Sequence, residues 1–320
     1  MEDGKKTTQH ETKKFSIQDS LKSQDTEEWL DIHFTRKIGF LWARLAIPLH
    51  ITPNMITIAS IFIGAFGSFL FYYDDLKTNI AGMLLLTLAN TFDSADGQLA
   101  RLTNNKTKLG RILDGLAGDV WFFIIYLVLV LRIINTGEFP TYLVWIVAVL
   151  AGSSHIIAAA MADYYRNVHL FFVKGENGSE HDKYSSVKEE FRKINFFKQP
   201  FTKISMWFYA NYTHQQEILS PKVKQFFETL FSIYPNNIPK DLSEEIREKN
   251  KKYMPLTNIL QFNTRVIFLF FSLLINKVWL YFCFDIIVMN SILIYLIYKE
   301  EQLFGKYDKE LKHLNKLKHY

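Results

Sequence analysis

Long apolar blocks separated by polar segments restrict the folds that are open to this chain. A helix that crosses a lipid bilayer needs ~20 mostly apolar residues. Apolar blocks lie at residues 51–73, 80–90, 116–134, 142–161, 256–275 and 278–298, and the second of them runs on into a segment rich in Asp. These blocks predict an all-α integral membrane protein with about six transmembrane helices.

The distribution of Lys and Arg predicts how the chain is oriented. Basic segments next to membrane helices stay preferentially on the cytoplasmic side. Residues 101–111, the segment before the first block, residues 164–255 and the segment after 298 are basic, whereas the connections 73–79 and 132–141 are short and less basic. We therefore expect both termini and the Asp-rich segment on the cytoplasmic side of a cell or inner membrane.

Composition excludes several other descriptions of the chain. The first residues lack the apolar core of a secretory signal peptide. Cys283 is the only cysteine, so an intrachain disulfide is impossible. No segment predicts binding to nucleic acid, and no second copy of the Asp-rich segment supports a transporter built from internal repeats.

The polar segments divide the rest of the chain. We expect residues 1–26 to be a disordered cytoplasmic N-terminus and residues 27–50 to form an amphipathic juxtamembrane helix. Its apolar residues recur at helical spacing, at Leu30, Phe34, Ile38, Leu41 and Leu45. An interfacial position fits its basic residues, and packing against another helix is the alternative.

The remaining segments follow from the position of the apolar blocks. Residues 51–163 are predicted to form the membrane catalytic core, 164–255 a cytoplasmic insert, 256–299 the last two transmembrane helices and 300–320 a basic, solvated cytoplasmic tail. The insert carries no recognised catalytic pattern. It is either a structural cover over the site or an element that selects the substrate, and its aromatic runs SMWFYANYTH and FFETLFSIYP could also lie along the membrane.

The Asp-rich segment places several carboxylates together at the edge of an apolar environment. Asp93, Asp96, Gly97 and Ala100 are spaced so that they share one helix face, at the cytoplasmic end of the second block. Asp114 lies at the start of the third block, after a short loop. Because neighbouring antiparallel helices meet at such a loop, we expect the three carboxylates to converge at the membrane boundary.

Three carboxylates at this depth would repel one another and lose hydration unless a cation compensates them. Oxygen ligands without a nearby His or Cys favour Mg²⁺, Mn²⁺ or Ca²⁺ over zinc. Gly97 and Gly110 leave room for a ligand, and Arg101 offers a guanidinium for a phosphate oxygen. The alternative is a surface helix pair that carries incidental acidic residues.

The full pattern D-x2-D-G-x2-A-R-x8-G-x3-D resembles the signature of the CDP-alcohol phosphatidyltransferase family. Its positions are filled here by Asp93, Asp96, Gly97, Ala100, Arg101, Gly110 and Asp114. The segment ITPNMIT, with Pro53, Asn54 and Thr57, is also similar to the corresponding segment of that family. The resemblance extends over roughly residues 45–165 and otherwise rests on the number of spans.

This resemblance implies an enzyme that transfers a phosphorylated group from a CDP-linked donor to an alcohol and releases CMP. It implies that Asp93, Asp96 and Asp114 bind Mg²⁺ or Mn²⁺. It also places Gly97, Ala100, Arg101 and Gly110 in the pocket for cytidine diphosphate, and it implies a homodimer. Two donor arrangements stay open: CDP-diacylglycerol with a polar alcohol, which we favour, or a CDP-alcohol with diacylglycerol.

The family signature continues with a last Asp four residues after Asp114, which is a metal-site residue and the expected general base. Gly118 occupies that position here, and the acid follows at Asp119. One residue rotates a side chain by ~100° around a helix. Three alternatives follow: a π-bulge turns Asp119 inward, another group takes the proton, or the protein only binds nucleotide or lipid.

Two arginines near the ends of predicted spans are candidates for binding a phosphate of the acceptor. Arg166 follows the fourth block, and Arg265 lies within the fifth. Charged residues at such depths are often functional, and they favour a phosphorylated polyol such as inositol phosphate as the acceptor. For Arg265 the alternative is a buried ion pair with Asp285 of the next block.

Overall fold

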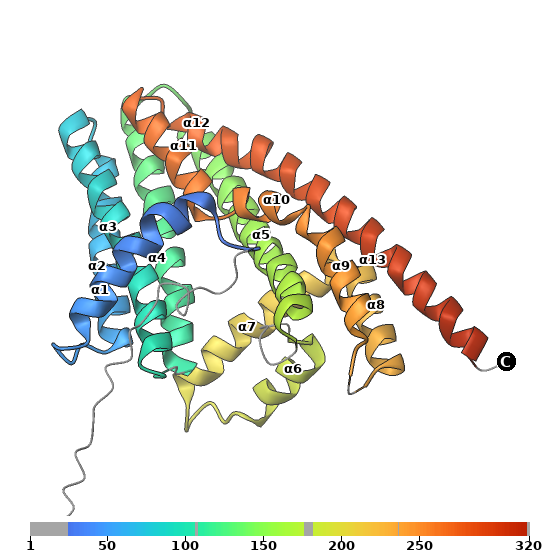
Figure 1. Cartoon of the computed structure of the whole chain (residues 1–320). Coiled ribbons are helices and arrows are strands. Elements are labelled where there is room, and N and C mark those ends of the chain that lie inside the picture. The colour runs from blue at the N-terminus through green and yellow to red at the C-terminus, as the bar shows by residue number, and fades with distance from the viewer. Residues whose placement is uncertain (1–24, 106–107, 176–181, 236, 319–320) are drawn as a thin grey trace, which may run out of the picture.

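The computed structural model describes residues 25–105, 108–175, 182–235 and 237–318. Within these ranges, the side chains of Lys108, Leu109, Arg111, Ile112, Asp114, Phe201 and Lys318 lie outside the description. Every regular element in the described ranges is a helix, joined to the next by a short connection (Figure 1). The predicted disordered segment 1–26 falls almost entirely outside the described residues. The structure thus confirms the all-α class.

The helices have the following bounds in chain order: η2 Asp31–Thr35, α1 Arg36–Ala46, α2 Pro53–Phe69, η3 Leu70–Tyr72, α3 Leu76–Leu102, α4 Lys108–Thr136, α5 Thr141–Lys174, α6 Tyr184–Lys193, α7 Pro200–Leu219, α8 Pro221–Ile233, α9 Lys240–Lys251, α10 Met254–Ile259, α11 Phe262–Leu274, α12 Trp279–Cys283, η5 Phe284–Met289 and α13 Asn290–Lys318. Helices η2 and η5 are π-helical, and η3 is a 3₁₀ turn.

All six predicted apolar blocks are helical, but the block 256–275 is divided between α10 and α11, and the helices differ in length and polarity. Among the described residues, four segments are long and apolar enough to cross a bilayer: Pro53–Tyr72, Gly115–Thr136, Thr141–Lys174 and Trp279–Leu317. Helix α3 is long enough, but its last turns carry the polar Asp motif. Helix α11 has only 13 residues, or about 20 Å, against a hydrocarbon core of about 30 Å.

The end of the bundle where α3 stops and α4 starts is called here the motif end. Helix α2 begins there because Thr52 caps it by accepting a hydrogen bond from the Met55 amide at 3.4 Å, and Pro53 occupies the first turn. Helices α2, α3 and α4 then run side by side away from the motif end (Figure 1). They position the signature at one end of a packed core.

Close approach of α2 to α4 depends on Gly64. A Cβ atom built on Gly64 would lie 2.3 Å from Nε1 of Trp121, whose indole is buried and donates to the carbonyl of Ile61 at 3.3 Å. If the indole moved aside, it would lose this hydrogen bond and its packing in the buried core. Gly64 is therefore required by packing and not by backbone conformation.

Replacing Gly64 by Ala is expected to lower stability by about 1–3 kcal/mol, because a methyl group must displace the buried indole. The matched control is Gly152→Ala on α5, where no atom lies within 4 Å of the added Cβ. The thermal unfolding midpoint of both variants in one detergent checks this. Equal midpoints for the two variants would contradict the packing argument.

Helix α1 lies across α3 through a face of small residues. Gly39, Ala43 and Ala46 are buried, and a Cβ on Gly39 would lie 2.9 Å from side-chain atoms of Gln98 and Ser94 on α3. The opposite face of α1 exposes the large apolar side chains of Leu41 and Leu45, and Phe34 of the preceding η2 is exposed as well. The packing on α3 confirms the alternative considered for the amphipathic helix, and its position at the membrane interface stays a prediction.

The segment after residue 298 differs from the predicted solvated tail. Helix α13 continues without a break from the last apolar block, and its residues Phe304, Tyr307 and Leu311 are buried. They join a core that also contains Phe226 and Phe227 of α8. These positions recur every three or four residues, so one face of a charged helix is apolar and is covered by α8.

A carboxylate of α13 also accepts hydrogen bonds from backbone amides in the first turn of α8. Glu301 accepts hydrogen bonds from the backbone amides of Lys222 and Val223 at 3.1 and 3.2 Å. The first amides of a helix have no partner within the helix, and an anion there also interacts favourably with the helix dipole. The run FFETLFSIYP, which contributes Phe226 and Phe227, therefore packs inside the protein and does not lie along the membrane.

The opposite end of the bundle is held together by one buried arginine. Arg132 of α4 donates to the carbonyl of Phe71 at 2.9 Å and to side-chain oxygens of Asn79 at 3.1 Å, Asp74 at 2.9 Å and Asn276 at 2.9 Å. These acceptors lie in the α2–α3 region and in the α11–α12 connection. A single guanidinium thus joins three parts of the membrane core.

Candidate active site

The last turns of α3 carry the Asp motif on a partly buried face. Asp96 is only 3% exposed, and the Thr57 hydroxyl of α2 donates to its carboxylate. The same hydroxyl also contacts the carbonyl of Pro53 at 3.1 Å, which fixes its position within the first turn of α2. Asp93 lies one turn before Asp96 and is half-buried. The segment ITPNMIT therefore touches the motif directly.

Arg101 lies beside the glycine of the motif. A Cβ atom built on Gly97 would be 3.4 Å from Nη1 of Arg101, so the guanidinium rests against the helix one turn earlier. A Cβ at position 97 would be at an ordinary van der Waals distance from the guanidinium, so this contact does not by itself require the glycine. The cation of the signature is held next to the turn that carries Asp93 and Asp96, and Ala100 lies half-buried beside it.

Helix α1 supports the motif from behind. The Gln98 amide donates to the carbonyl of Arg36 at 3.0 Å and to the hydroxyl of Ser94 at 3.1 Å. Both Gln98 and Ser94 are buried on the side of α3 that faces α1. Because these bonds join α1 to the last turns of α3, they fix the direction in which the opposite face presents its carboxylates.

The other half of the signature lies on α4. Gly110 and Asp114 occupy its first turns, but the side chain of Asp114 lies outside the described residues. Among the described side chains, no group of three or more His, Cys, Asp or Glu residues is arranged so that it could hold a metal ion. The convergence of three carboxylates therefore stays a prediction, which rests on the helix positions of Asp93, Asp96 and Asp114.

The turn around Asp119 is regular. Helix α4 is α-helical throughout Lys108–Thr136, so the described structure has no π-bulge there. A Cβ atom built on Gly115 or Gly118 would have no other atom within 4 Å, so no neighbouring group crowds this turn and distorts its α-helical geometry. Asp119 is exposed and lies about 140° around the helix from Asp114. The bulge, the first of the three alternatives, is not what the chain adopts.

Arg166 belongs to a polar cluster that joins the membrane core to the insert. It donates to Asp163 at 2.9 Å and to Gln261 at 3.0 Å. The Tyr212 hydroxyl of α7 donates to the second oxygen of Asp163 at 3.1 Å. Burial raises the pKa of Tyr212 well above its ordinary value, so the phenol remains a neutral donor.

Arg265 forms the buried pair that was the alternative to phosphate binding. Its guanidinium contacts the Asp285 carboxylate, and both side chains are fully buried. The Tyr126 hydroxyl also donates to Asp285 and lies 3.3 Å from Nδ1 of His155. Asp285 is part of the π-helical turn η5, a type of distortion that often occurs at constrained sites.

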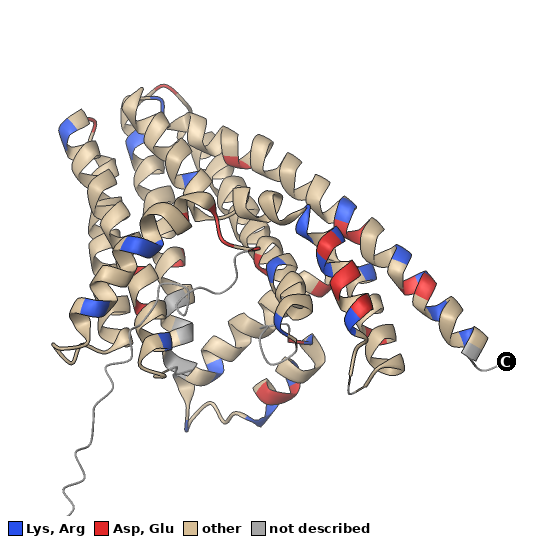
Figure 2. Cartoon of the chain, in the orientation of Figure 1, with Lys and Arg blue, Asp and Glu red and all other residues tan. Residues whose placement is uncertain are grey.

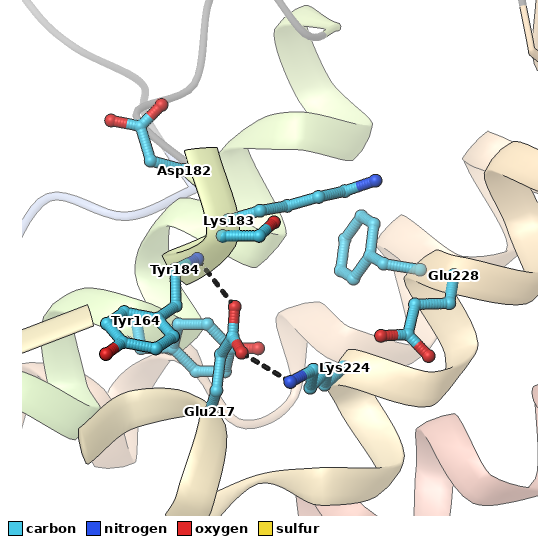
Figure 3. A pocket seen from close by; sticks show the side chains of 9 residues that line it. Tyr164, Asp182, Lys183, Tyr184, Glu217, Lys224 and Glu228 are labelled. Atoms are coloured by element: carbon cyan, nitrogen blue, oxygen red, sulfur yellow. Dashed lines mark hydrogen bonds and ion pairs between the residues drawn. The ribbon is translucent and has the colours of Figure 1, made fainter. Parts of the chain in front are cut away.

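A separate small cavity of about 150 Å³ lies within the insert (Figure 3). Its lining includes Tyr164, Tyr184, Glu217 and Lys224. Glu217 accepts from the Tyr184 amide at 2.7 Å and pairs with Lys224 at 2.6 Å, so its carboxylate is occupied by neighbouring groups. The described residues that line this cavity include none of the signature.

Comparison with known proteins identifies the family to which the signature belongs. The sequence profile described as CDP-alcohol phosphatidyltransferase matches residues 50–211, about half of the chain. The chain belongs to this family. The match confirms the resemblance seen in the Asp motif, and it extends through the four helices α2 to α5 and into α7.

Curated relatives match shorter stretches. A protein of Aquifex aeolicus strain VF5, named as uncharacterized, is 38% identical over 87 residues, which are 25% of this chain and 43% of that protein. CDP-diacylglycerol–serine O-phosphatidyltransferases of Helicobacter pylori strains J99 and 26695 are 37% and 36% identical over 75 residues, 23% of this chain and 30% of each enzyme. The chain thus spans less than half of the length of these relatives.

The described residues of this CDP-alcohol phosphatidyltransferase family member fit a hard divalent cation. The donors at the motif are carboxylate oxygens, which is the chemistry that Mg²⁺ and Mn²⁺ prefer. Asp96 is nearly inaccessible to solvent and sits at the end of an apolar helix, where a carboxylate is costly unless a cation or hydrogen bonds compensate it. The carboxylates of Asp93 and Asp96 have the chemistry that such an ion binds, and the assignment of Asp93, Asp96 and Asp114 as its ligands stays a prediction.

Sequence reasoning did not foresee which side chains support the family signature. Thr57 was noted as part of a similar segment, but its contact with Asp96 joins residues that are 39 positions apart. Tyr212 and Gln261, which complete the cluster around Asp163 and Arg166, lie 49 and 95 positions from their partners. No periodicity or spacing links such distant polar residues, so only the fold reveals them.

Thr57→Val is expected to lower kcat/KM by about 10–100-fold, because it removes the hydroxyl that orients a metal-site carboxylate. The shape of the side chain is kept, so the unfolding midpoint should change little. Thr87→Val on α3 is the control, since the Thr87 hydroxyl bonds only to the Met83 carbonyl of its own helix at 2.8 Å. If Thr57 positions the Asp96 carboxylate, Thr57→Val must also raise the Mg²⁺ concentration that gives half-maximal activity. Unchanged metal dependence would contradict it.

Proposed function

We propose that this protein transfers a phosphatidyl group from CDP-diacylglycerol to a small polar alcohol and releases CMP, with Mg²⁺ or Mn²⁺ as the cofactor. The observation that carries the proposal is the complete signature from Asp93 to Asp114 at the motif end, in a chain that belongs to the family. Relatives that match part of it are named as serine phosphatidyltransferases, which supports this donor arrangement.

The proposed reaction exchanges one phosphorus–oxygen bond for another. The hydroxyl oxygen of the acceptor attacks the phosphorus that carries diacylglycerol, and the bond from that phosphorus to the bridging oxygen of CMP breaks. CMP leaves with the bridging oxygen, and the acceptor hydroxyl loses its proton. A divalent cation, when bound, supplies positive charge next to the diphosphate as the leaving group becomes more negative.

The residues of the signature have distinct tasks in this proposal. Asp93, Asp96 and Asp114 hold the cation. Gly97, Ala100 and Gly110 allow the diphosphate to approach the helix backbones, because they present little or no side chain. Arg101, held against Gly97, contacts a phosphate oxygen through its planar donors. The apolar surface around the bundle accommodates the acyl chains of the donor.

The acceptor is proposed to be an alcohol without a phosphate, with serine as the first candidate. A phosphorylated acceptor such as inositol phosphate needs a cationic group that is available to it. Arg166 and Arg265 were the candidates, but each is paired with an aspartate of the chain, Asp163 or Asp285. We further propose a homodimer, with the motif end and both termini on the cytoplasmic side, in agreement with the basic segments there.

The direct test is CMP release by the purified protein in lipid vesicles with Mg²⁺ or Mn²⁺. CDP-diacylglycerol is offered with serine, glycerol phosphate or inositol phosphate, and CDP-alcohols are offered separately with diacylglycerol. Release with CDP-diacylglycerol that depends on serine is the expected result. Release only from a CDP-alcohol would reverse the donor arrangement, and metal-dependent CDP binding without any release would make the protein a binding homologue.

Asp119→Asn tests whether Asp119 takes the proton of the acceptor. Because Asp119 points away from the motif on a regular helix, we expect this variant to keep turnover within about twofold, whereas loss of a general base costs about 10²–10⁴-fold. The control is Asp114→Asn, which should be inactive. A loss of that size at Asp119 would identify it as the base and would require α4 to change shape when substrate binds.

A further inference from the structure

The connection between α6 and α7 exposes a concentrated group of large apolar side chains. Phe197 is 93% exposed, Phe208 62% and Trp207 51%, and Phe196 and Ile204 are also exposed. These five residues are called here the α6–α7 corner. Ile204, Trp207 and Phe208 are spaced by three and four residues, so they share one face of α7. Apolar patches of this kind on a protein surface mark a site of interaction.

The charge around the α6–α7 corner has one sign. Residues 191–216 contain no Asp or Glu, but they contain Arg192, Lys193, Lys198 and Lys203. The first three are exposed, while Lys203 folds back over the ring of Phe191 at 3.8 Å. Figure 2 shows acidic residues on α6 but none on the described part of the connection or on the first turns of α7. The corner is therefore complementary to a surface that is apolar and anionic.

The depth of the corner follows from where α7 crosses α5, a helix that starts at the end of the bundle opposite the motif end. The Gln216 amide donates to the carbonyl of Ala160 at 2.9 Å, and Tyr212 donates to Asp163. Ala160 and Asp163 lie about 29 and 33 Å from Thr141 along α5, at about 1.5 Å per residue. A hydrocarbon core is about 30 Å thick, so α7 crosses near the membrane boundary when Thr141 marks the opposite boundary.

Helix α9 contacts α5 at a greater distance from Thr141 than α7 does. His169 contacts Asn250 at 3.0 Å, and Ser243 donates to the carbonyl of Phe172 at 3.2 Å. These α5 residues lie about 42 and 47 Å from Thr141, well beyond the hydrocarbon core. In Figure 1, the first turns of α7 lie at the height of the motif end of α4, whose candidate membrane span begins at Gly115.

We propose that the α6–α7 corner inserts its aromatic side chains into the headgroup layer of an anionic lipid bilayer, on the same side as the Asp motif. Aromatic residues, Trp above all, favour this layer, and the lysines and arginine around them are attracted to anionic headgroups. The insert is then attached to the bilayer at a point separate from the transmembrane helices. This inference does not depend on which reaction the motif supports.

The experiment places a fluorophore at position 197 by Phe197→Cys in a Cys283→Ala background, since Cys283 is the only natural cysteine. The protein is reconstituted in vesicles of phosphatidylcholine alone or with phosphatidylglycerol, and brominated lipids act as quenchers. The control carries the fluorophore at Glu248→Cys, an exposed position on α9 of the same insert. Gel filtration of each labelled variant verifies folding.

Brominated lipid is expected to quench the fluorophore at position 197 at least threefold more than at position 248, with the larger quenching in phosphatidylglycerol vesicles. Adding Lys193→Glu and Lys198→Glu is expected to reduce quenching at position 197 toward that at position 248. Equal quenching at the two positions would overturn the proposal. Protection of position 197 from a water-soluble quencher without quenching by lipid would also overturn it, because a second copy or another protein would then cover the corner.

Discussion

Asp96→Asn should lower metal-dependent CMP release by about 10³-fold or more while the protein remains inserted and folded. The substitution removes one anionic oxygen from a site where a cation provides several kcal/mol of stabilisation, and each 1.36 kcal/mol corresponds to a factor of about ten. The Asn side chain has nearly the same volume, and it can still accept a hydrogen bond from Thr57. The effect is therefore expected in activity and not in stability.

The assay compares initial rates of CMP release over a range of Mg²⁺ concentrations, with a chelator as the zero point. Asp241→Asn is the matched control, because Asp241 is an exposed aspartate on the first turn of α9. The chelator should abolish release by the wild type and by the control alike. Wild-type turnover by Asp96→Asn would end the proposal of a metal site at the motif, whatever the acceptor proves to be.

Arg132→Leu should cost about 2–6 kcal/mol of stability, because two buried acceptors lose their donor at about 1–3 kcal/mol each, whereas the ion-pair partner Asp74 is 65% exposed. Arg132 is only 4% exposed and donates to four acceptors in separate parts of the core. Without it, the Phe71 carbonyl and the Asn79 side chain remain buried without this donor. The leucine cannot replace any of these hydrogen bonds, although it fills part of the volume.

The unfolding midpoint and the yield of folded protein in detergent check this expectation. Arg44→Leu is the control, since Arg44 is exposed on α1 and the change in charge is the same. Arg132→Lys should fall between the two, because an ammonium group retains the charge but cannot reach the separate acceptors as a planar fork does. A midpoint for Arg132→Leu equal to that of Arg44→Leu would show that the network contributes nothing.

Apolar blocks and the Asp signature were sufficient to predict the helical class, the membrane location and the family. The physical reason is that both are local: a span is a run of apolar residues, and the signature is a helix face plus one short loop. The predicted block 256–275 was wrong as one continuous helix, because the chain there forms a separate short helix, α10, before α11. Pro255 lies in the first turn of α10, so this short helix starts before the apolar block and is separate from α11.

Pairings between distant residues could not be derived in the same way. Arg265 had two candidate partners of comparable chemistry, a ligand phosphate or Asp285, and only the packing of α11 against η5 selects the second. The tail was misjudged because its charged residues outnumber the apolar ones, although Phe304, Tyr307 and Leu311 share one face. At Asp119 the sequence allowed a bulge, and the regular α-helical course of α4 through this turn argues against it.

The uninterrupted course of α13 has a mechanical consequence. This single helix begins at Asn290 and, nearer its other end, makes the aromatic contacts with α8. Its first half is fixed by the Asn290–Ser154 hydrogen bond of 2.9 Å inside the membrane core. Because α13 packs on α8 beyond its apolar block, a change in the tilt of α13 in the bilayer would be expected to displace α8 as well.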